Sequence, residues 1–349
     1  MSSPATSILD SRVESILSGD VRAAARLMRD LDDAVPSARA AVRELHSHTG
    51  RAFIVGVTGN PGSGKSTLTD QLIDHWRQSG LTVGVVAIDP TSPFTGGAIL
   101  GDRVRMQRHS TDDGVFIRSL ATRGHLGGLS RSTLDVVRVM DAMGKDIIII
   151  ETVGVGQDEI EVTRAAHSSV VVVVPGLGDD IQAIKAGILE IADIFVVNKA
   201  DRQGADRTVQ DLRTMLDLFR PSGGRLDSSW AEAPRGVAQS SGEGGWSVPI
   251  LKTVATDGDG ISDVAAGLNE HRRHLESCGD WTRRERDRAR LELIEALREQ
   301  LVSGCLQALE ADDGRLDEIV GRIASRKADP YTLASEIARD HILEPGSSS

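Results

Sequence analysis

The sequence predicts an α/β fold in which helices cover both faces of a mostly parallel β-sheet. Between residue 50 and about residue 275, seven apolar runs alternate with helical segments, the pattern of parallel strands joined by crossover helices. A glycine-rich turn joins the first apolar run to a helix. Segments with helical periodicity also extend the chain at both ends, so we expect helical extensions on a central α/β domain.

The runs that predict strands are short and almost continuously apolar. Such runs are typical of parallel strands that are buried on both faces. They occupy residues 53–57, 82–88, 114–118, 146–150, 170–174, 194–198 and 249–255.

Changes in composition divide the chain into three predicted parts. Residues 1–48 are rich in Ala, Arg, Leu and Asp, and their periodicity predicts a helical N-terminal extension. Residues 49–278 form the central domain, which a Gly/Ser/Ala-rich stretch at about 221–247 interrupts; we interpret this stretch as a mobile surface insertion. Residues 279–349 contain the helical patterns "WTRRERDRARLELIEALREQL" and "LASEIARDHIL", so we expect a C-terminal helical arm.

Composition and charge limit the classes of partner. The 349 residues are 40% hydrophobic, enough for a large core, and carry a net charge of -11, which disfavours nucleic acids and anionic membranes as partners. Two cysteines make no disulfide framework, consistent with a reducing cytosol. No apolar run is long enough to span a bilayer, and no signal peptide is recognisable. We therefore expect a soluble, cytoplasmic protein.

The turn "GNPGSGKS" at residues 59–66 has the spacing of a phosphate-binding loop. In such loops glycines let successive backbone N–H groups point at a polyphosphate, and the following helix directs its positive N-terminal end at the anion. Lys65 is expected to reach the β- and γ-phosphates and Ser66 to bind Mg²⁺. A glycine-rich turn can also be a simple connection, but the required strand and helix flank this one. The candidate nucleotide-binding residues here are Gly59, Pro61, Gly62, Ser63, Gly64, Lys65, Ser66 and Thr67.

A second motif, "NKAD" after the apolar run "IFVV", predicts which base is bound. The Asp201 carboxylate can accept hydrogen bonds from the ring N1–H and the exocyclic amine of guanine, a donor pair that adenine lacks. Asn198 completes the motif, and the aliphatic stem of Lys199 can lie across the purine. Four residues alone are weak evidence, but after a phosphate loop in one domain they predict guanine specificity. Backbone N–H groups of Thr253, Val254 and Ala255 are weaker candidates for the guanine carbonyl.

Three acidic residues are candidates for the metal side of this site. Asp89 and Glu151 each end an apolar run, and Asp102 follows in the polar stretch after Asp89. Mg²⁺ usually combines a few carboxylates with phosphate oxygens and water, so Ser66 plus some of these acids would satisfy it. Any one acid, Asp102 above all, can instead be a solvated carboxylate or a helix cap. Lys65, Asp89 and Glu151 are the candidate catalytic residues, with GTP/GDP and Mg²⁺ as the expected ligands.

The motifs together resemble one family. "GVTGNPGSGKST", "AIDPTSPFTGGAILGDRVRM", "IIETVGVGQDE" and "VPGLGDDIQAIKAGILEIADIFVVNKAD" are similar, in order, to the MeaB/ArgK-type GTPases, relatives of the human MMAA protein. The resemblance covers roughly residues 50–275. It implies a P-loop NTPase fold of the SIMIBI class, in a subgroup with Glu in the metal-side motif, which accounts for Glu151. It also implies a homodimer formed through the C-terminal arm.

The resemblance further implies a function. Family members are GTP-hydrolysing chaperones of adenosylcobalamin-dependent acyl-CoA mutases, typically methylmalonyl-CoA mutase, and they control cofactor loading and protect the mutase. Carried over by position, residues 176–187 match the additional switch loop of the family, with Asp180, Gln182 and Lys185 as candidates for coupling the nucleotide state to the partner. The 221–247 insertion departs from the family pattern.

Two functions of different classes remain at this point. The first is a regulatory GTPase that binds a B12-dependent mutase. The second is an ATPase or kinase of amino-acid (LAO/AO-type) transport, a label sometimes attached to ArgK-type sequences. The "NKAD" motif argues against ATP, and no acceptor-binding pocket is recognisable in the sequence, so the regulatory GTPase is favoured.

The pattern after Trp281 leaves the role of the arm open. Leu291, Ile294, Leu297 and Leu301 fall along one stripe, which by itself more often packs on its own domain than on a partner. The family resemblance favours a partner subunit instead. Five arginines crowd the start of this helix, and we interpret them as a solvated charge run: Arg283, Arg284, Arg286, Arg288 and Arg290.

Overall fold

The structure is a computed structural model. It describes residues 4–33, 35–89, 106–121, 131–152, 158–176, 191–219, 245–312 and 314–343. The chain divides into two compact units, Met1–Asp287 and Arg288–Ser349.

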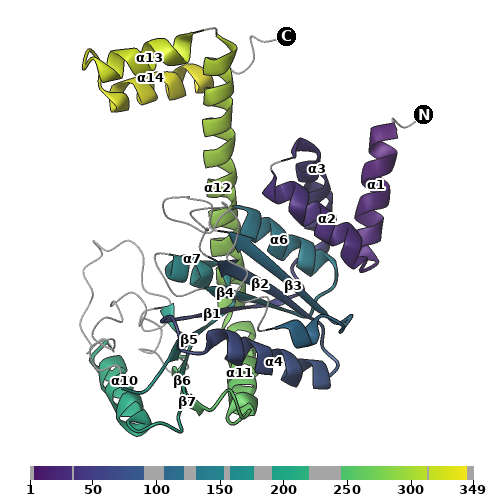
Figure 1. Ribbon diagram of the computed structural model, residues 1–349, viewed down its shortest axis with the longest axis vertical. Helices are drawn as coiled ribbons and strands as arrows, with labels where there is room; N and C mark the ends of the chain where they lie inside the picture. Colours follow the sequence, from purple (N-terminus) through teal and green to yellow (C-terminus); the bar gives the residue numbers. More distant parts are fainter. Residues whose placement is uncertain are drawn as a thin grey trace. The chain divides into compact units, whose positions relative to one another are not determined.

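A seven-stranded sheet forms the centre of the first unit, as Figure 1 shows. Every pairing between its strands is parallel, and the strand order is β3-β2-β4-β1-β5-β6-β7. The predicted α/β fold is therefore confirmed, and each of the seven apolar runs supplies one strand. The strands are β1 (Phe53–Gly59), β2 (Val83–Asp89), β3 (Val115–Ala121), β4 (Ile147–Thr152), β5 (Ser168–Val173), β6 (Ile194–Asn198) and β7 (Ile250–Thr253).

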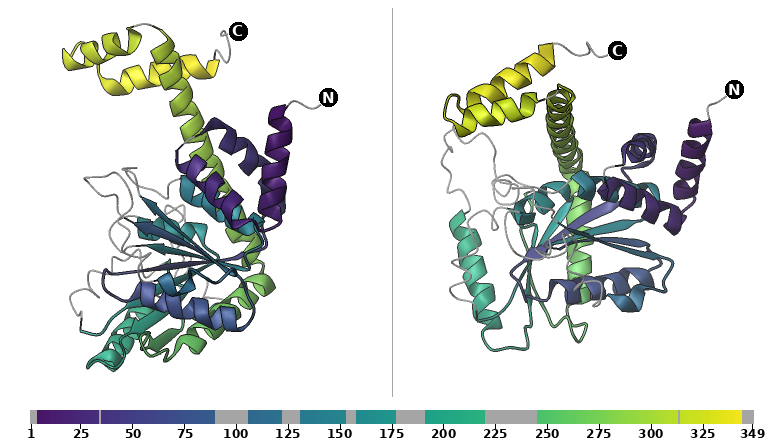
Figure 2. Two further views of the ribbon diagram at one scale, coloured as in Figure 1. Left: turned by 45° about the vertical axis from the view of Figure 1, so that its right-hand side comes forward. Right: turned by 45° about the horizontal axis from the view of Figure 1, so that its top comes forward.

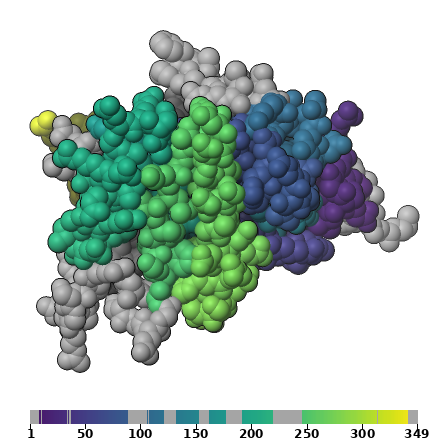
Figure 3. Space-filling view, turned by 90° about the horizontal axis from the view of Figure 1, so that it is seen from below, coloured from purple at the N-terminus to yellow at the C-terminus, as the bar shows by residue number. Residues whose placement is uncertain are grey.

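Helices cover both faces of the sheet. On one face, α4 (Lys65–Gln78) and α11 (Ile261–Cys278) bury apolar side chains against alternate residues of the central strands, including Val55 and Val57. On the other face lie α6 (Arg131–Ala142), α7 (Asp158–Ala165) and α10 (Ala205–Phe219). Gly56 allows the close approach of α7, because a Cβ there would lie 3.0 Å from Val162 Cγ1. Seen from below, α11 lies between α10 and α4 (Figure 3).

Three helices confirm the predicted helical N-terminal segment: α1 (Pro4–Leu17), α2 (Val21–Asp32) and α3 (Pro36–Leu45), followed by the short η1 (His46–His48). They group together beside α6, as both views in Figure 2 show. An ion pair between Asp32 of α2 and Arg118 of β3 adds a polar attachment to the sheet. The Asp141 carboxylate of α6 accepts hydrogen bonds from the backbone N–H groups of residues 50, 51 and 52, which fixes the connection into β1.

The C-terminal helices are α12 (Asp280–Ala311), α13 (Arg315–Ala324) and α14 (Pro330–Leu343). The two helical patterns predicted for this region are confirmed, whereas α13 was not predicted. Among the described residues of the second unit, Leu309 and Leu333 are the buried apolar side chains. Six large apolar side chains of α12 are exposed: Leu293, Ile294, Leu297, Leu301, Val302 and Leu306. Within the residues that the structure describes, no helix combines the length and apolar character needed to cross a membrane.

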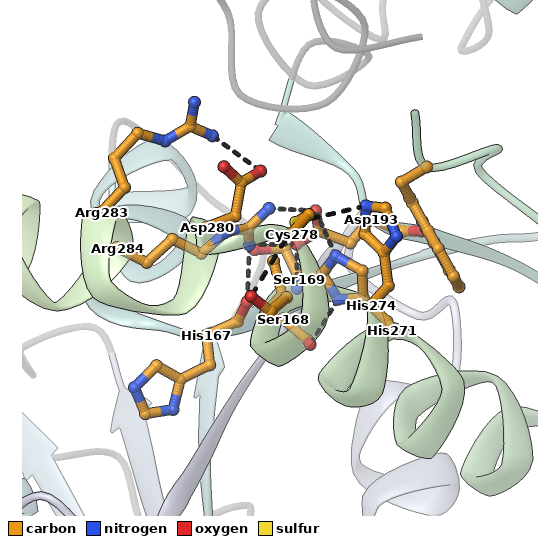
Figure 4. A network of polar contacts seen from close by, with 12 residues as sticks. His167, Ser168, Ser169, Asp193, His271, His274, Cys278, Asp280, Arg283 and Arg284 are labelled. Atoms are coloured by element: carbon orange, nitrogen blue, oxygen red, sulfur yellow. Dashed lines mark hydrogen bonds and ion pairs between the residues drawn. The ribbon is translucent and has the colours of Figure 1, made fainter. Parts of the chain in front are cut away.

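A buried polar network holds the first turns of α12 to the amino ends of β5 and β6 (Figure 4). The guanidinium of Arg284 pairs with the Asp193 carboxylate and also donates to the backbone oxygen of His167. Asp193 also accepts from Ser169 N–H, and its backbone oxygen accepts from the indole N–H of Trp246. We call this group, together with Ser168 and His271, the amino-edge network.

The amino-edge network corrects one interpretation of the sequence. Arg284 was expected to belong to a solvated charge run, but its side chain is only 4% exposed. One helical face carries Trp281, Arg284 and Glu285, and all three contact the sheet or His167. The arginine is therefore a buried structural side chain, because its position on the helix places it opposite Asp193.

Candidate functional site

The carboxyl ends of five strands bring the predicted site residues to one edge of the sheet. Gly59 ends β1, Asp89 ends β2, Asn198 ends β6 and Thr253 ends β7, while Glu151 is the penultimate residue of β4. Strand β1 lies between β4 and β5, where the strand order changes direction. In open parallel sheets, ligands bind outside the carboxyl ends of the strands at such a position.

The loop between β1 and α4 depends on its glycines. Gly59, Gly62 and Gly64 have φ angles of 136°, 75° and 91°, which residues other than glycine rarely adopt. A Cβ on Gly59 would lie 2.1 Å from the backbone oxygen of Val172. Helix α4 starts directly after Gly64, so its N-terminal end, which is the positive end of the helix dipole, faces the loop. This is the geometry that a phosphate-binding loop requires.

The remaining loop residues differ in exposure. Pro61 and Gly62 are exposed, Ser63 is buried, and Thr67 on α4 is half-buried. Lys65 is buried, and its ammonium donates hydrogen bonds to the backbone oxygens of Gly59 at 2.7 Å and Asn60 at 3.1 Å. The cation is thus held by backbone oxygens at the start of the loop.

Ser66 and Glu151 meet beneath the loop. The Ser66 hydroxyl donates to Glu151 Oε1 at 2.6 Å, and both side chains are buried. Thr152, which follows Glu151 in β4, shares a hydrogen bond of 3.1 Å with Thr58 of β1. A hydroxyl and a carboxylate are hard oxygen ligands, so this pair fits Mg²⁺.

The other two predicted metal-side acids are Asp89 and Asp102. The backbone of Asp89 ends β2 beside β4, but its side chain lies outside the described residues, as does Asp102 altogether. Within the described part of the chain, no three His, Cys, Asp or Glu side chains gather as a metal site. The metal expectation therefore depends on Ser66 and Glu151.

Asn198 connects three segments of the site. Its amide nitrogen donates to the backbone oxygen of Ser63 at 2.8 Å, and its amide oxygen accepts from Thr253 Oγ1 and Ala255 N–H, both at 3.1 Å. The side chain is 2% exposed. Because all three partners are fixed, Asn198 ties the phosphate-binding loop to the end of β7.

Lys199 and Asp201 follow at the surface. Lys199 has a φ of 57°, which is costly for a residue other than glycine, and its ammonium donates to the backbone oxygen of Gly62 at 2.7 Å. Asp201 is exposed, so its carboxylate is accessible to a ligand. The N–H of Val254 donates to the backbone oxygen of Asp259, and that of Ala255 to Asn198, so both already have protein acceptors. Their predicted contact with guanine stays a prediction.

The predicted coupling residues Asp180, Gln182 and Lys185 lie outside the described residues. Sequence reasoning also missed a cluster on α4, in which Arg108 pairs with Asp70 and Asp74 while the buried His109 lies with Nε2 3.0 Å from Asp70 Oδ1. The spacing of Ser66, Asp70 and Asp74, four residues apart along one helix, was the available signal.

Comparisons with known proteins agree with this geometry. Residues 24–310 match the family described as "Methylmalonyl Co-A mutase-associated GTPase MeaB". A Pyrococcus abyssi protein named as a candidate GTPase is 47% identical over 335 residues, covering 96% of this chain and 97% of that protein. The Escherichia coli GTPase ArgK is 44% identical over 154 residues, 44% of this chain and 46% of ArgK.

Two more distant likenesses complete the comparison. The Caenorhabditis elegans mitochondrial "Methylmalonic aciduria type A homolog" is 33% identical over 268 residues, 75% of this chain and 62% of that protein. The crystal structure of an "LAO/AO transport system kinase" superposes with a TM-score of 0.62 at 22% identity, covering 97% of this chain and 98% of that one, and so shows the same fold. With a P-loop at the centre of a parallel sheet and a family match over most of its length, this chain is a GTPase of the MeaB/ArgK family.

Proposed function

We propose that this GTPase uses Mg²⁺ and acts as a chaperone of an adenosylcobalamin-dependent acyl-CoA mutase, in which GTP hydrolysis regulates cofactor loading and protects the mutase. The observation that carries the GTPase part is the position of Asn198, which joins the phosphate-binding loop to the base motif through Ser63 and Ala255. The mutase as partner is supported by the printed name of the matching family and by the nematode relative.

In this proposal, the phosphate side consists of the 59–66 loop and the N-terminal end of α4. The ammonium of Lys65 leaves the backbone oxygens of Gly59 and Asn60 and pairs with the β- and γ-phosphates, an exchange that keeps a buried cation compensated. Ser66 and Glu151 hold Mg²⁺, with Asp89 and Asp102 as further candidates. When bound there, the ion would neutralise negative charge on the phosphate oxygens.

The base side consists of Asp201, Lys199 and Asn198, whose amide joins the phosphate-binding loop to the end of β7. Asp201 accepts from the two donors of guanine, and Lys199 covers one face of the ring. Two hydrogen bonds hold the strained backbone of Lys199: the N–H of Ala200 donates to the backbone oxygen of Thr253, and the Lys199 ammonium donates to that of Gly62. The base is thus bound by groups that are fixed to the same loop as the phosphates.

Hydrolysis in this site depends on positioning and charge more than on covalent chemistry. Arg108 is bound to two carboxylates of α4. We therefore propose slow intrinsic hydrolysis that the mutase accelerates, with Asp180, Gln182 and Lys185 as the coupling residues.

The proposed assembly is a homodimer through the C-terminal arm, residues 279–349. Among the described residues of the second unit, Leu309 and Leu333 are the buried apolar side chains, while Ile294, Leu297 and Leu301 on α12 are 37%, 50% and 41% exposed. These three residues lie on one side of the helix, with Leu293 next to them. A contiguous apolar stripe of this kind is expected to be covered, and a second copy of the chain carries the complementary stripe.

The deciding experiment measures GTP and ATP hydrolysis with and without saturating B12-dependent mutase from the same organism. GTP should be hydrolysed in preference to ATP, and the mutase should raise the rate. Cobalamin loading of the apo-mutase should also depend on which guanine nucleotide is present.

The alternative, an ATPase or kinase of amino-acid transport, predicts a different result. Phosphate transfer to an amino-acid transport component, with ATP equal to GTP or better, would support it. Equal GTP turnover with and without the mutase, and loading that ignores the nucleotide, would exclude the chaperone role while leaving the GTPase assignment intact.

A further inference from the structure

The pairing between β1 and β4 ends before either strand does. Its last pair is Val57 with Glu151, whereas β1 continues beside β5 as far as Gly59, and β4 continues beside β2 as far as Thr152. Strands β1 and β4 therefore part next to the phosphate-binding loop. Glu151, the carboxylate that accepts from Ser66, stands at the last paired position.

One side-chain hydrogen bond spans the place where these two strands part. The hydroxyl of Thr152 on β4 donates to the hydroxyl of Thr58 on β1 at 3.1 Å. The two residues are 2% and 0% exposed. We call them the threonine pair. Each member comes directly after a residue of the last backbone pair, so the side chains continue the link between the strands by one position.

The threonine pair and the metal-side residues lie on opposite faces of the sheet. Side chains alternate along a strand, so Thr152 points away from the side of Glu151. Glu151 meets Ser66 of α4, and Thr152 and Thr58 therefore lie on the face that α6 and α7 cover. The threonine pair can thus act on the metal side only through the backbone of β4.

The stability of the sheet does not require two hydroxyls at this place. Apart from Glu151, the threonine pair supplies the polar side chains of β1 and β4, which are otherwise apolar or glycine. Replacing both partners of a buried hydrogen bond by apolar groups of similar shape is often nearly neutral. A hydrogen bond, however, has a preferred length and direction, which an apolar contact lacks. It fixes Thr152 relative to β1, and Thr152 shares a peptide bond with Glu151.

We propose that Thr58 and Thr152 are positioning residues for metal binding: their hydrogen bond fixes the end of β4 and thereby holds the Glu151 carboxylate opposite Ser66. The inference rests on the proposed Mg²⁺-dependent GTPase function. Ser66 is on α4 and Glu151 on β4, so a shift of the end of β4 changes the spacing of these two oxygen ligands directly. Loss of the threonine hydrogen bond should weaken Mg²⁺ binding in the presence of nucleotide and leave nucleotide binding without metal unchanged.

The test compares wild type with Thr58→Val and Thr152→Val, because valine has the branched shape of threonine without the hydroxyl. One readout is the Mg²⁺ concentration that halves the dissociation rate of a fluorescent GDP analogue; another is GDP affinity in EDTA. Each variant should need roughly tenfold more Mg²⁺, the lower end for residues that orient a metal ligand, and keep its affinity in EDTA. The Tm should stay within about 4 °C of wild type.

Two controls separate positioning from the loss of a buried hydroxyl. Thr58→Ser and Thr152→Ser keep the hydroxyl and should keep the wild-type Mg²⁺ requirement. Ser168→Ala removes a buried hydroxyl at the amino end of β5, where it lies 2.6 Å from the imidazole of His271, and should lower the Tm without changing the Mg²⁺ requirement. An equal rise in the Mg²⁺ requirement in Ser168→Ala would contradict the inference.

The double variant Thr58→Val with Thr152→Val tests whether the two residues act as one unit. Each single change already removes the hydrogen bond, so the double variant should need no more Mg²⁺ than the single variants. It leaves neither hydroxyl behind, and it therefore carries the comparison if a single valine lowers the Tm strongly.

Three results are decisive. An unchanged Mg²⁺ requirement in the valine variants, or additive effects in the double variant, would overturn the inference and leave the GTPase function standing. A wild-type protein whose GDP release and GTP hydrolysis ignore Mg²⁺ would instead overturn the proposed function itself.

Discussion

The guanidinium of Arg284 donates two parallel hydrogen bonds to the carboxylate of Asp193, NH1 to Oδ2 at 2.8 Å and NH2 to Oδ1 at 2.7 Å. Burial raises the pKa of Asp193, but the charge of Arg284 and the hydrogen bonds to it hold that pKa below its ordinary value. The pair joins α12 to the amino end of β6. It is almost completely removed from water, so each charge depends on the other.

We predict that Arg284→Met destabilises the protein by about 3–5 kcal/mol, because it leaves the Asp193 carboxylate buried without its cation. Urea unfolding followed by tryptophan fluorescence measures this loss, and Trp246 and Trp281 lie beside the pair. Arg207→Ala, which removes an exposed pair at 3.9 Å on α10, is the control and should cost less than about 0.5 kcal/mol. Equal effects of the two changes would contradict the assignment.

A second prediction concerns acid stability. Burial lowers the pKa of His271 to about 4 from its ordinary 6.5, although the nearby Asp193 charge opposes this, so the folded protein keeps the imidazole neutral. The unfolded chain binds a proton below pH 6.5 and the folded chain only near pH 4. Stability from this residue is therefore complete above pH 6.5 and is lost as the pH falls toward 4, by about 3 kcal/mol.

The measurement compares urea unfolding of wild type and His271→Gln between pH 7.5 and about pH 4. Glutamine keeps a polar group opposite Ser168, whose hydroxyl lies 2.6 Å from the imidazole. The variant should lose less stability than wild type over this range. Parallel losses would show that His271 does not titrate in this window.

The glycines of the phosphate-binding loop should differ sharply in tolerance. Gly59→Ala places a Cβ 2.1 Å from the backbone oxygen of Val172, a contact that the backbone must move to relieve. Gly62→Ala meets nothing within 4 Å, so its cost is the φ of 75° alone, about 1 kcal/mol. We expect Gly59→Ala to abolish GTP binding or folding and Gly62→Ala to retain both. Calorimetric GTP binding checks this, and a reversed order would contradict the loop geometry.

Base selection should depend on Asp201. Asp201→Asn replaces one acceptor of the guanine pair by a donor, so GTP should lose its advantage over ATP while xanthosine triphosphate binds relatively better. The phosphate contacts are unaffected, because Asp201 lies outside the loop and its side chain is exposed. Competition of the three nucleotides against a fluorescent GDP analogue gives the ratios. Full retention of the GTP preference would show that another group selects the base.

The exposed stripe on α12 should hold the proposed dimer. Leu297→Glu with Leu301→Glu puts charges on this surface and should give a monomer in light scattering after gel filtration, with GTP affinity unchanged. Leu218→Glu is the matched control, since Leu218 on α10 is 78% exposed, and it should leave the mass as in wild type. A dimer that survives the double change would place the interface elsewhere.

Local sequence predicted the strands and the phosphate loop well, because both depend on spacing within one segment. The β1 and β4 runs are apolar throughout since both faces are covered, and the loop needs glycine where φ is positive. Strand order was not predictable, because pairing joins segments such as Phe53 and Ile147 that are far apart in the chain. Helical extensions at both ends followed from periodicity.

The side-chain roles that could not be predicted from the sequence depend on contacts between residues far apart in the chain. Arg284 has arginine neighbours at 283 and 286, and only its position opposite Asp193 distinguishes it. Asn198 was recognised as part of a motif, but its contacts with Ser63 and Ala255 exist only once β6 and β7 are paired. His109 gave no signal at all, since the carboxylate that it faces at 3.0 Å, that of Asp70, is on α4.

The central position of β1 also has a consequence for synthesis of the chain. The strands made directly after β1, namely β2, β3 and β4, all lie on one side of it, and β5, β6 and β7 lie on the other. When the ribosome has released the chain through Thr152, Ser66 and Glu151 have both been made, whereas Asn198 and Asp201 have not. At that moment β1, whose seven residues are all buried in the finished sheet, is an open and apolar edge. Between the synthesis of β4 and that of β5, the nascent chain therefore exposes β1 as an apolar edge that another chain could pair with.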